Sequence, residues 1–184
     1  ETMRVLGDKE AARKAMIANG FPVVPGSEGT LESVREAVVT ARGIGYPLMI
    51  KAVKGGGGKG IRIVEDAAAL EREFPLVKRE AELAFGDGGV YLEAYLPEAR
   101  HIEVQILADR HGAVLHLGTR ECTLQRKNQK LIEEAPAANV PAETLAAIEQ
   151  TAVEIARAVG YQNAGTVEFL LTRDGRFFFM EMNA

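Results

Sequence analysis

Two glutamates near the end of the sequence have the spacing of a metal site. Asp174-Gly175 is a favoured two-residue hairpin turn between two apolar runs. Counting outward from that turn places Glu168 opposite Glu181, with Thr166 and Asn183 as the next pair on the same face. Two opposed carboxylates repel each other unless a cation lies between them or one holds a proton. Because Mg²⁺ prefers hard oxygen ligands, the hairpin predicts a divalent metal site, Mg²⁺ or Mn²⁺, at Glu168, Glu181 and Asn183.

The other side chains of this hairpin predict where the site faces. A two-residue turn assigns these residues to the core face: Val167, Phe169, Leu171, Phe178, Met180 and Met182. The same turn leaves Leu170, Phe177 and Phe179 beside the two carboxylates. This mixture is typical of a cleft in which apolar side chains contact a nucleotide base and carboxylates bind a metal. The alternative is a pair of solvent-exposed glutamates on an ordinary sheet, and a one-residue bulge would change the face assignment.

A run of glycines lies between two short strand-like segments. Gly55, Gly56, Gly57, Gly58, Lys59 and Gly60 separate residues 47–52 from residues 61–64. A dinucleotide fingerprint must open a helix, but the β-branched segment from Ile61 favours a strand. A Walker loop is excluded because Gly60 follows Lys59 where Ser or Thr is required. The pattern therefore favours a glycine-rich hairpin over nucleotide phosphates, with Lys51 and Lys59 adding positive charge, and a structural linker is the alternative.

Polar residues also alternate with apolar ones after Arg100. His101, Glu103 and Gln105 fall on one face of the expected strand. For His101, an orienting hydrogen-bond donor is favoured over a general base. Residues 125–130 (Gln-Arg-Lys-Asn-Gln-Lys) form a dense set of donors whose alternative is a solvated loop.

Composition limits the class of protein. The 184 residues are 47% hydrophobic and 26% charged, which is typical of a globular protein, and no apolar run has the length of a membrane span. The net charge of −4 argues against nucleic acid as the main partner. Cys122 is the only cysteine, which excludes an internal disulfide, fits a reducing compartment such as the cytoplasm or mitochondrial matrix, and predicts a buried small side chain. The absence of an initial Met and the end beside a core strand suggest part of a longer protein.

The expected elements alternate in blocks of helices and antiparallel strands, which indicates the α+β class. Helices are expected over residues 9–19, after Thr30, from Asp66 with an interruption at Pro75, and over 141–159. Strands are expected over residues 47–52, 61–64, 90–96, 101–108, 113–120, 165–172 and 176–183, with a polar loop at 123–130.

Taken together, these residues resemble the ATP-grasp domain of biotin carboxylases over nearly the whole chain. The matching segments are Gly7–Lys9, Val24–Ser27, Gly45–Pro47, Lys51–Gly60, Arg100–Gln105, Glu121-Cys122, Gln125–Lys130, Glu133–Pro136, Gly165–Phe169 and Glu181–Asn183. The resemblance implies an ATP-grasp fold in which two α+β lobes grip a nucleotide. By this likeness, residues 1–20 are a helix joining a preceding domain, 21–97 the lid, and 98–184 the first part of the larger lobe.

The resemblance also implies roles for single residues. Lys9 and Lys51 match lysines that touch nucleotide phosphates. Glu93, with the backbone of Ala94 and Leu96, matches the adenine contact, and Leu170 matches an adenine-packing residue. His101, Gln125 and Asn128 match further nucleotide positions, and Gly55–Gly60 with Ile61 match the phosphate loop. Glu168 and Glu181 match magnesium ligands, and Lys130 matches a bicarbonate-contacting lysine.

The implied reaction is attack of bicarbonate on the γ-phosphate of Mg-ATP to give carboxyphosphate, followed by carboxylation of biotin. The implied partners are a biotinylated carrier domain and a carboxyltransferase, and the carboxyl acceptor stays open. The chain departs from the family pattern at Asn128, where some members have histidine, and at Lys54, which replaces a glycine. The interval from Glu168 to Glu181 is one residue longer, and a later Arg-x-Gln-x-Glu segment is absent, so the chain alone is expected to be inactive.

Two other functions stay open on the sequence. Another ATP-grasp ligase, of the carboxylate-amine or carbamoyl-phosphate type, would share the nucleotide residues but is disfavoured by the 125–130 loop and the His101 strand. A non-catalytic nucleotide-binding module would bind without turnover.

Overall fold

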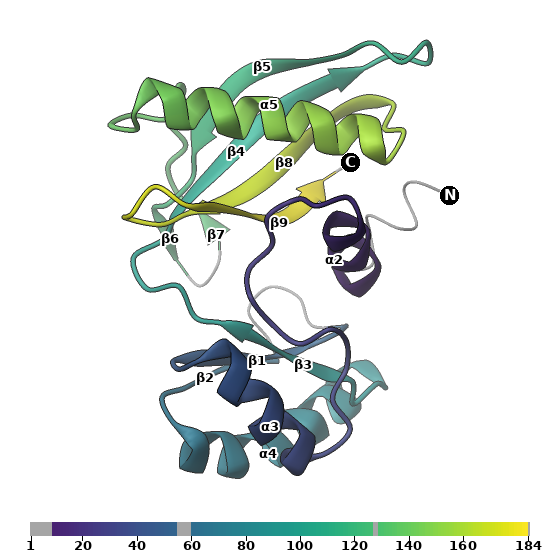
Figure 1. The fold of residues 1–184 in the computed structure, drawn as a ribbon, viewed down its shortest axis with the longest axis vertical. Helices are drawn as coiled ribbons and strands as arrows, with labels where there is room; N and C mark the ends of the chain where they lie inside the picture. Colours follow the sequence, from purple (N-terminus) through teal and green to yellow (C-terminus); the bar gives the residue numbers. More distant parts are fainter. Residues whose placement is uncertain (1–8, 55–59, 127–128, 184) are drawn as a thin grey trace. The chain divides into compact units, whose positions relative to one another are not determined.

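The computed structural model describes residues 9–54, 60–126 and 129–183, with side chains from Ala11 onward, and the chain forms two compact units (Figure 1). One unit is Val24–Pro97. The other combines Glu1–Val23 with Glu98–Ala184. Helix α2 (Lys9–Ala18) therefore belongs to the same unit as the C-terminal sheet. In the sequence, the whole Val24–Pro97 unit lies between that helix and that sheet. Each unit has its own hydrophobic core.

The Val24–Pro97 unit is a three-stranded antiparallel sheet with two helices packed on one face (Figure 1). Its strands are β1 (Leu48–Ala52), β2 (Ile61–Val64) and β3 (Val90–Ala94), in the order β2-β1-β3. Helices α3 (Val34–Ile44) and α4 (Ala67–Phe85) cover the face that carries the buried Leu48 and Ile50. The period-two burial along β1 leaves Lys51 on the opposite face.

Helix α4 corrects one expectation from the sequence. It begins at the N-cap Asp66, whose carboxylate accepts a 2.7 Å hydrogen bond from the Ala69 amide, and it continues through Pro75 to Phe85. A proline inside a helix removes one backbone hydrogen bond, which usually interrupts or bends it. Here Leu70 and Phe74 before the proline and Val77 after it are buried in one core, and this shared packing carries the helix past the missing bond.

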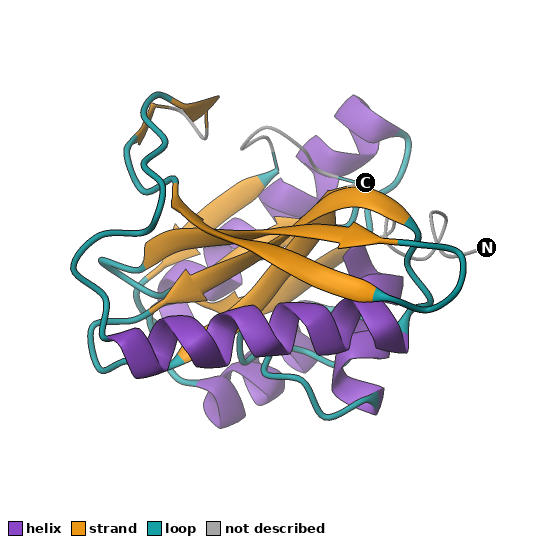
Figure 2. Cartoon of the chain, turned by 90° about the horizontal axis from the view of Figure 1, so that it is seen from above, coloured by secondary structure: helices purple, strands orange, loops and turns teal. Residues whose placement is uncertain are grey.

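The second unit is a four-stranded antiparallel sheet whose one face is covered by helices (Figure 2). Its strands, in spatial order, are β5 (Val114–Glu121), β4 (Arg100–Ala108), β8 (Asn163–Leu171) and β9 (Phe177–Asn183). Helices α5 (Ala142–Ala158) and α2 (Lys9–Ala18) pack against the same core. The alternating residues Ile102, Val104 and Ile106 face that core and are fully buried. The other sheet face, called the open face below, carries His101, Glu103 and Gln105.

The β8–β9 hairpin has the expected glutamate pair but not the expected turn. Glu168 is paired with Glu181 and Thr166 with Asn183, as predicted. The connection is a three-residue loop, because the Thr172 amide donates to the Arg176 carbonyl at 2.8 Å and Gly175 takes a positive φ of 85°. A register shift follows, and Met180 is the extra residue of a β-bulge.

The three-residue loop and the bulge together change the predicted faces of β9 between Phe177 and Met180. Phe179, which was expected beside the carboxylates, is the buried partner of Phe169, and Phe178, which was expected in the core, lies opposite Leu170 on the open face. Met180 was expected in the core but is only half-buried, because a bulge residue has no single opposite partner. Phe177 packs at the edge of the core, with its ring centroid 5.7 Å from that of Phe169.

The expected polar loop over residues 123–130 contains a short hairpin. Strands β6 (Gln125–Arg126) and β7 (Gln129–Lys130) pair antiparallel, with Gln125 opposite Lys130. A pairing of two residues per strand adds little backbone support of its own. The position of Lys130 therefore depends on what its side chain contacts.

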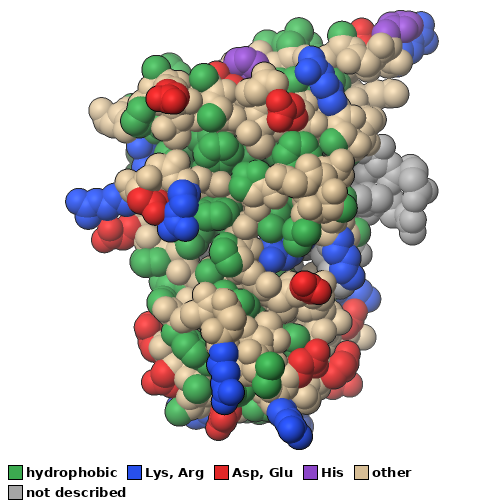
Figure 3. All heavy atoms as spheres, viewed as in Figure 1, with side chains coloured by type: hydrophobic (Ala, Val, Ile, Leu, Met, Phe, Trp, Pro, Cys, Tyr) green, Lys and Arg blue, Asp and Glu red, His purple; other side chains and the backbone are tan. Residues whose placement is uncertain are grey.

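The α+β class predicted from the sequence is confirmed by the antiparallel sheets and packed helices. No helix in the described ranges combines the length and apolar character needed to cross a membrane. On the face that Figure 3 draws, basic and acidic side chains are interspersed over both units, and neither sign forms a continuous field.

Candidate functional site: a buried carboxylate–lysine cluster

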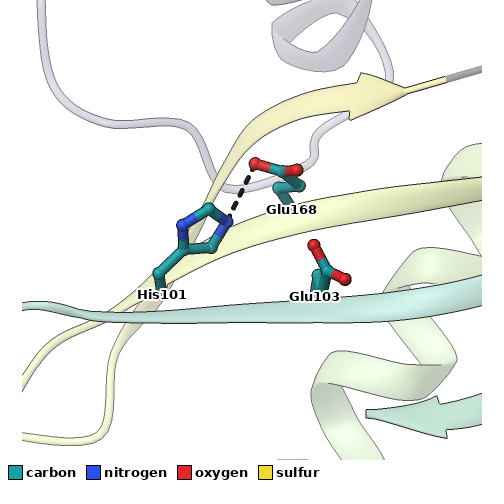
Figure 4. A group of neighbouring side chains, drawn as sticks. All are labelled: His101, Glu103 and Glu168. Carbon is teal, nitrogen blue, oxygen red and sulfur yellow. Dashed lines mark ion pairs between the residues drawn. The ribbon is translucent and has the colours of Figure 1, made fainter. Parts of the chain in front are cut away.

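Three polar side chains project from the open face of the second unit into one group (Figure 4). His101 and Glu103 come from β4, and Glu168 comes from the adjacent β8. Strand register brings them together, because Glu103 is directly opposite Glu168 and His101 is opposite Leu170. All three are buried, with Glu103 and Glu168 each only 2% exposed. Buried carboxylates need compensating partners, so their contacts define the site.

Glu168 has three polar neighbours. Its Oε2 lies 2.8 Å from His101 Nε2, and its Oε1 accepts hydrogen bonds from Lys130 Nζ at 2.9 Å and from Asn183 Nδ2 at 2.7 Å. Burial alone would raise the pKa of Glu168, but His101 and Lys130 together hold that pKa below its ordinary value. Glu168 is therefore an ionised carboxylate at neutral pH.

The ring of His101 is held from its other side by Gln125. Gln125 Nε2 lies 2.7 Å from His101 Nδ1 and also donates to the Cys122 carbonyl at 2.8 Å. This arrangement leaves Nδ1 as the acceptor and places the ring proton on Nε2. Nε2 is buried and, despite its closeness to Glu168, makes no aligned hydrogen bond within the described residues. The His101 ring is thus oriented with Nε2 directed toward the Glu168 carboxylate.

Lys130 bridges the two buried glutamates. Its ammonium lies 2.5 Å from Glu103 Oε2 and 2.9 Å from Glu168 Oε1. Burial lowers the pKa of Lys130, but hydrogen bonds to Glu103 and Glu168 more than offset this and raise it well above the ordinary value. The ammonium is fixed as a cation in the centre of the group.

Glu103 and Arg120 are site residues whose importance the sequence reasoning missed. Arg120 lies directly opposite Glu103 on β5 and contacts Glu103 Oε1 through Nε and Nη2, each at 2.5 Å. The alternation of polar residues on β4 did place Glu103 on the correct face. No sequence signal pointed to Arg120, because its role depends on the pairing of β4 with β5.

Cys122 is confirmed as a buried side chain. It is 0% exposed, and burial, followed by the negative charge of Glu103, raises the pKa of its thiol to about 12. A thiol with that pKa carries almost no thiolate at neutral pH, which makes it a packing residue.

The group has the ligand types that a divalent cation prefers. Ligand atoms of His101, Glu103 and Glu168 lie within 4.8 Å of one another, and Glu181 lies opposite Glu168 on the same face. The Lys130 ammonium already lies against Glu103 and Glu168, so positive charge is present there. Glu181 is half-buried, and it pairs with Glu168 across the two strands, so the pair has the hard carboxylate oxygens that Mg²⁺ prefers. The donor set therefore fits Mg²⁺ at the predicted pair.

A second pair of predicted residues meets in the Val24–Pro97 unit. Lys51 Nζ lies 2.5 Å from Glu93 Oε2, and its ammonium lies 6.0 Å from the centre of the Tyr91 ring. The two residues share a sheet face because Lys51 is opposite Tyr91, and Glu93 is opposite Met49 two residues away. Glu93 is buried and the Lys51 side chain is 22% exposed, so the ion pair is partly shielded from water.

The other predicted positions that the structure describes in this unit, Gly60, Ile61, Ala94 and Leu96, were expected to act through their backbone or to lie beside the phosphate loop. Gly60 has a φ of 74°, and a Cβ placed there would lie 2.7 Å from the Ala52 Cβ, so only glycine fits. Ile61 begins β2 and is exposed, whereas Ala94 and Leu96 are half-buried. The Ala94 amide donates to the Pro25 carbonyl at 2.7 Å.

Of the other predicted positions, Leu170 is described by the structure, whereas several lie outside the described residues. Leu170 is half-buried on the open face, opposite His101 and Phe178, as the hairpin reasoning expected for Leu170 itself. Gly55, Gly56, Gly57, Gly58, Lys59 and Asn128 lie outside the described ranges. Lys9 begins α2, and its side chain is likewise outside the description.

Comparison with known proteins places the chain in a family. Residues 8–184 match the family described as "Carbamoyl-phosphate synthase L chain, ATP binding domain". The chain belongs to this family of ATP-binding domains. Among curated proteins it is 49% identical over 183 residues to a biotin carboxylase of Nostoc sp., a match that covers 100% of this chain and 41% of the relative.

Solved structures give the same result. The chain is similar to a biotin carboxylase–β,γ-ATP complex from Campylobacter jejuni, with a TM-score of 0.94 and 45% identity over 100% of this chain and 41% of that one. It is also similar to the biotin carboxylase domain of Hydrogenobacter thermophilus 2-oxoglutarate carboxylase, solved with Mg-ADP, ADP and bicarbonate. That match has a TM-score of 0.91 and 43% identity, covering 98% of this chain and 40% of that one. The resemblance to biotin carboxylases and the ATP-grasp fold predicted from the sequence are thereby confirmed, and the chain spans about two fifths of these relatives' length.

Proposed function

We propose that this chain is the ATP-binding part of a biotin carboxylase, an ATP-dependent ligase that uses Mg-ATP and bicarbonate to form carboxyphosphate and then carboxylates biotin. The observation that carries the proposal is the opposition of Glu168 and Glu181 on the open face, beside the Lys130 ammonium. This arrangement offers carboxylate ligands for a metal and a fixed cation for an anionic substrate within one cluster. The relatives solved with Mg-ADP and bicarbonate support the same assignment.

In the second unit, we propose that Glu168, Glu181 and Asn183 hold Mg²⁺, which when bound neutralises nucleotide phosphates. Lys130 binds bicarbonate, because its ammonium is fixed and remains charged. His101, oriented by Gln125, donates from Nε2 to the nucleotide, and Leu170 packs against the base. Asn128 is a further nucleotide contact in this proposal.

In the Val24–Pro97 unit, we propose that Lys51 meets nucleotide phosphates and that Glu93, with the backbone of Ala94 and Leu96, recognises the adenine. Gly55–Gly60 and Ile61 cover the phosphates with backbone N–H groups. The Lys51–Glu93 ion pair supports this by showing that the two side chains already share one sheet face. Lys9 is proposed as a further phosphate contact.

The parent reaction would pass the carboxyl group to biotin on a carrier domain and from there to a carboxyltransferase. Relatives include a methylcrotonoyl-CoA carboxylase subunit alpha of Dictyostelium discoideum and a pyruvate carboxylase of Rhizobium etli, which accept different final substrates. The proposal accordingly assigns biotin as the direct acceptor and leaves the later acceptor unspecified.

The first test is calorimetric titration of the chain with ADP and with ATP, with and without Mg²⁺. The Glu168→Gln/Glu181→Gln variant removes both proposed ligand charges while keeping side-chain shape. Glu154→Gln on the exposed face of α5 is the matched control for loss of a carboxylate. We expect Mg²⁺-dependent binding that weakens by at least about tenfold in the double variant, a change of about 1.4 kcal/mol, and not in the control.

Phosphate release from ATP with and without bicarbonate, measured on a chain extended to the length of the biotin carboxylase relatives, separates the alternatives. Bicarbonate-dependent release supports a biotin carboxylase, and release that instead requires an amine acceptor indicates another ATP-grasp ligase. Mg-ATP binding without turnover even in that extended chain indicates a nucleotide-binding module. Failure of the folded wild-type chain to bind any nucleotide would contradict the proposed site.

A further inference from the structure

Glu103 has two oxygens with different partners. Oε1 is contacted by Arg120 through Nε and Nη2, and Oε2 is contacted by Lys130. Glu103 is 2% exposed, so water cannot replace either partner without opening the site. A carboxylate held on one oxygen by a planar guanidinium cannot turn freely about its Cγ–Cδ bond. Oε2 is therefore a fixed acceptor for the lysine ammonium.

The Arg120 guanidinium is itself held in place by hydrogen bonds on the side away from Glu103. Its Nη1 donates to Gln105 Oε1 at 3.0 Å, and Gln105 Nε2 donates to the Gly165 carbonyl at 2.9 Å. These contacts link the backbone of β8 to Glu103 through two side chains of neighbouring strands. Glu133 Oε2 lies 3.7 Å from Arg120 Nε, which adds a more distant negative charge on the exposed side. The guanidinium is thus held in one orientation by several partners.

Lys130, in contrast, has little support from the backbone. It belongs to the two-residue strand β7, which, among the described residues, is paired in a sheet with the two-residue strand β6 and no other strand. Its contacts to Glu103 and Glu168 therefore decide where its ammonium lies. If Glu168 turns to a metal, as proposed above, Glu103 is the remaining anchor of Lys130.

We propose that Arg120 is a positioning residue, which fixes Glu103 so that Glu103 holds the Lys130 ammonium at the anion-binding position. The inference rests on the proposed function for the role of Lys130, but the chain Gly165–Gln105–Arg120–Glu103–Lys130 is a property of this unit alone. Arg120 acts through Glu103 and touches no substrate in this proposal. Removing it frees Glu103 to rotate and releases Lys130 from its fixed position.

The strand pair β4–β5 contains a matched control. Arg100 on β4 makes a two-pronged contact to Glu121 on β5, with Nε–Oε1 at 2.8 Å and Nη2–Oε2 at 2.5 Å. The Arg100 side chain is 28% exposed and that of Arg120 is 27% exposed. Arg100→Gln therefore removes a comparable arginine–glutamate pair from the same two strands, but one that does not contact Lys130.

The test measures how fast an amine-specific acylating reagent labels Lys130, followed by mass spectrometry, in the full 184-residue chain. Lys78, which pairs with Glu32 in the other unit, is the internal reference. In Arg120→Gln we expect Lys130 labelling to rise about threefold to tenfold relative to Lys78, because an ammonium released from a fixed, buried Glu103 becomes accessible to the reagent. In Arg100→Gln the ratio stays at the wild-type value. A purely structural role for Arg120, which would loosen its own unit, should raise Lys130 labelling in Arg100→Gln as well.

Two further variants keep the inference falsifiable if Arg120→Gln folds poorly. Gln105→Met leaves the charge of Arg120 in place but removes its support, and we expect a smaller rise in Lys130 labelling. Arg120→Lys keeps the charge without the planar fork, and we expect labelling between wild type and Arg120→Gln. An unchanged Lys130 ratio in folded Arg120→Gln or Gln105→Met, or full protection in Arg120→Lys, would overturn the inference. None of these measurements needs nucleotide, so their failure is distinguishable from failure of the proposed function.

Discussion

Glu168 and Glu181 face each other across β8 and β9 because two one-residue irregularities cancel. The three-residue loop at residues 173–175 adds one residue to the connection, and the bulge at Met180 shifts the register back by one. With the loop alone, Glu168 would lie opposite Met180, and Glu181 would point to the core face. The extra residue in the Glu168-to-Glu181 interval is accommodated without moving either carboxylate from the open face.

This geometry predicts that Met180 can be deleted without losing the glutamate pair. Without Met180, Phe179, Glu181, Met182 and Asn183 would alternate regularly between the core face and the open face. We expect the deletion variant to fold and to keep cross-strand backbone NOEs between residues 168 and 181. Inserting an alanine after Met180 is the opposite change and should remove these NOEs. Loss of the 168–181 contact in the deletion variant would show that the bulge itself sets the pairing.

Replacement of Lys130 by methionine should destabilise the second unit. The variant keeps most of the side chain's volume but leaves the buried carboxylates of Glu103 and Glu168 without their shared cation. We expect a loss of about 1–3 kcal/mol in the free energy of unfolding, measured by urea titration. Adding Glu168→Gln should recover part of the loss, because it removes one of the unpaired charges. Additive losses in the double variant would contradict the coupling.

Acid should weaken the fold through Glu168. Its pKa in the folded chain is depressed: burial raises it, and His101 and Lys130 lower it by more. The stabilisation is therefore present above the ordinary value of 4.5 and is lost as the pH falls below it, toward the depressed pKa of the folded state. Between pH 7 and pH 3, the free energy of unfolding measured by urea titration should fall less steeply for Glu168→Gln than for wild type. Equal pH dependence in the two proteins would exclude a stabilising charge on Glu168.

Gly60 is expected to tolerate no side chain. Gly60→Ala combines a positive φ of 74° with a close contact to Ala52, whereas Gly20 has nearly the same φ, 75°, and nothing within 4 Å. We expect Gly20→Ala to cost about 1 kcal/mol from the backbone conformation alone, and Gly60→Ala to cost more because the strands must also move apart. Thermal melts of the two variants give the difference. Equal losses would mean that β1 and β2 relax freely around the added methyl group.

Much of this fold could be predicted from local pattern. The period-two alternation after Arg100 placed His101, Glu103 and Gln105 on one face, and Asp66 marked the start of α4. The glutamate pairing was also predicted, although the assumed turn was wrong and a bulge was needed to restore the result. Pro75 was misread because the packing that sustains α4 on both sides of it involves residues distant in sequence.

The sequence by itself determined which chemical groups are present and which face of β4 carries its polar side chains, because alternation is a property of consecutive residues. It therefore supplied Glu168, Glu181, Lys130 and His101. Only the tertiary structure decided that Lys130 bridges Glu103 and Glu168, and that Arg120 holds Glu103. Those contacts join residues 17 to 38 positions apart through strand pairing and a short hairpin, and their strength comes from burial that no local segment provides.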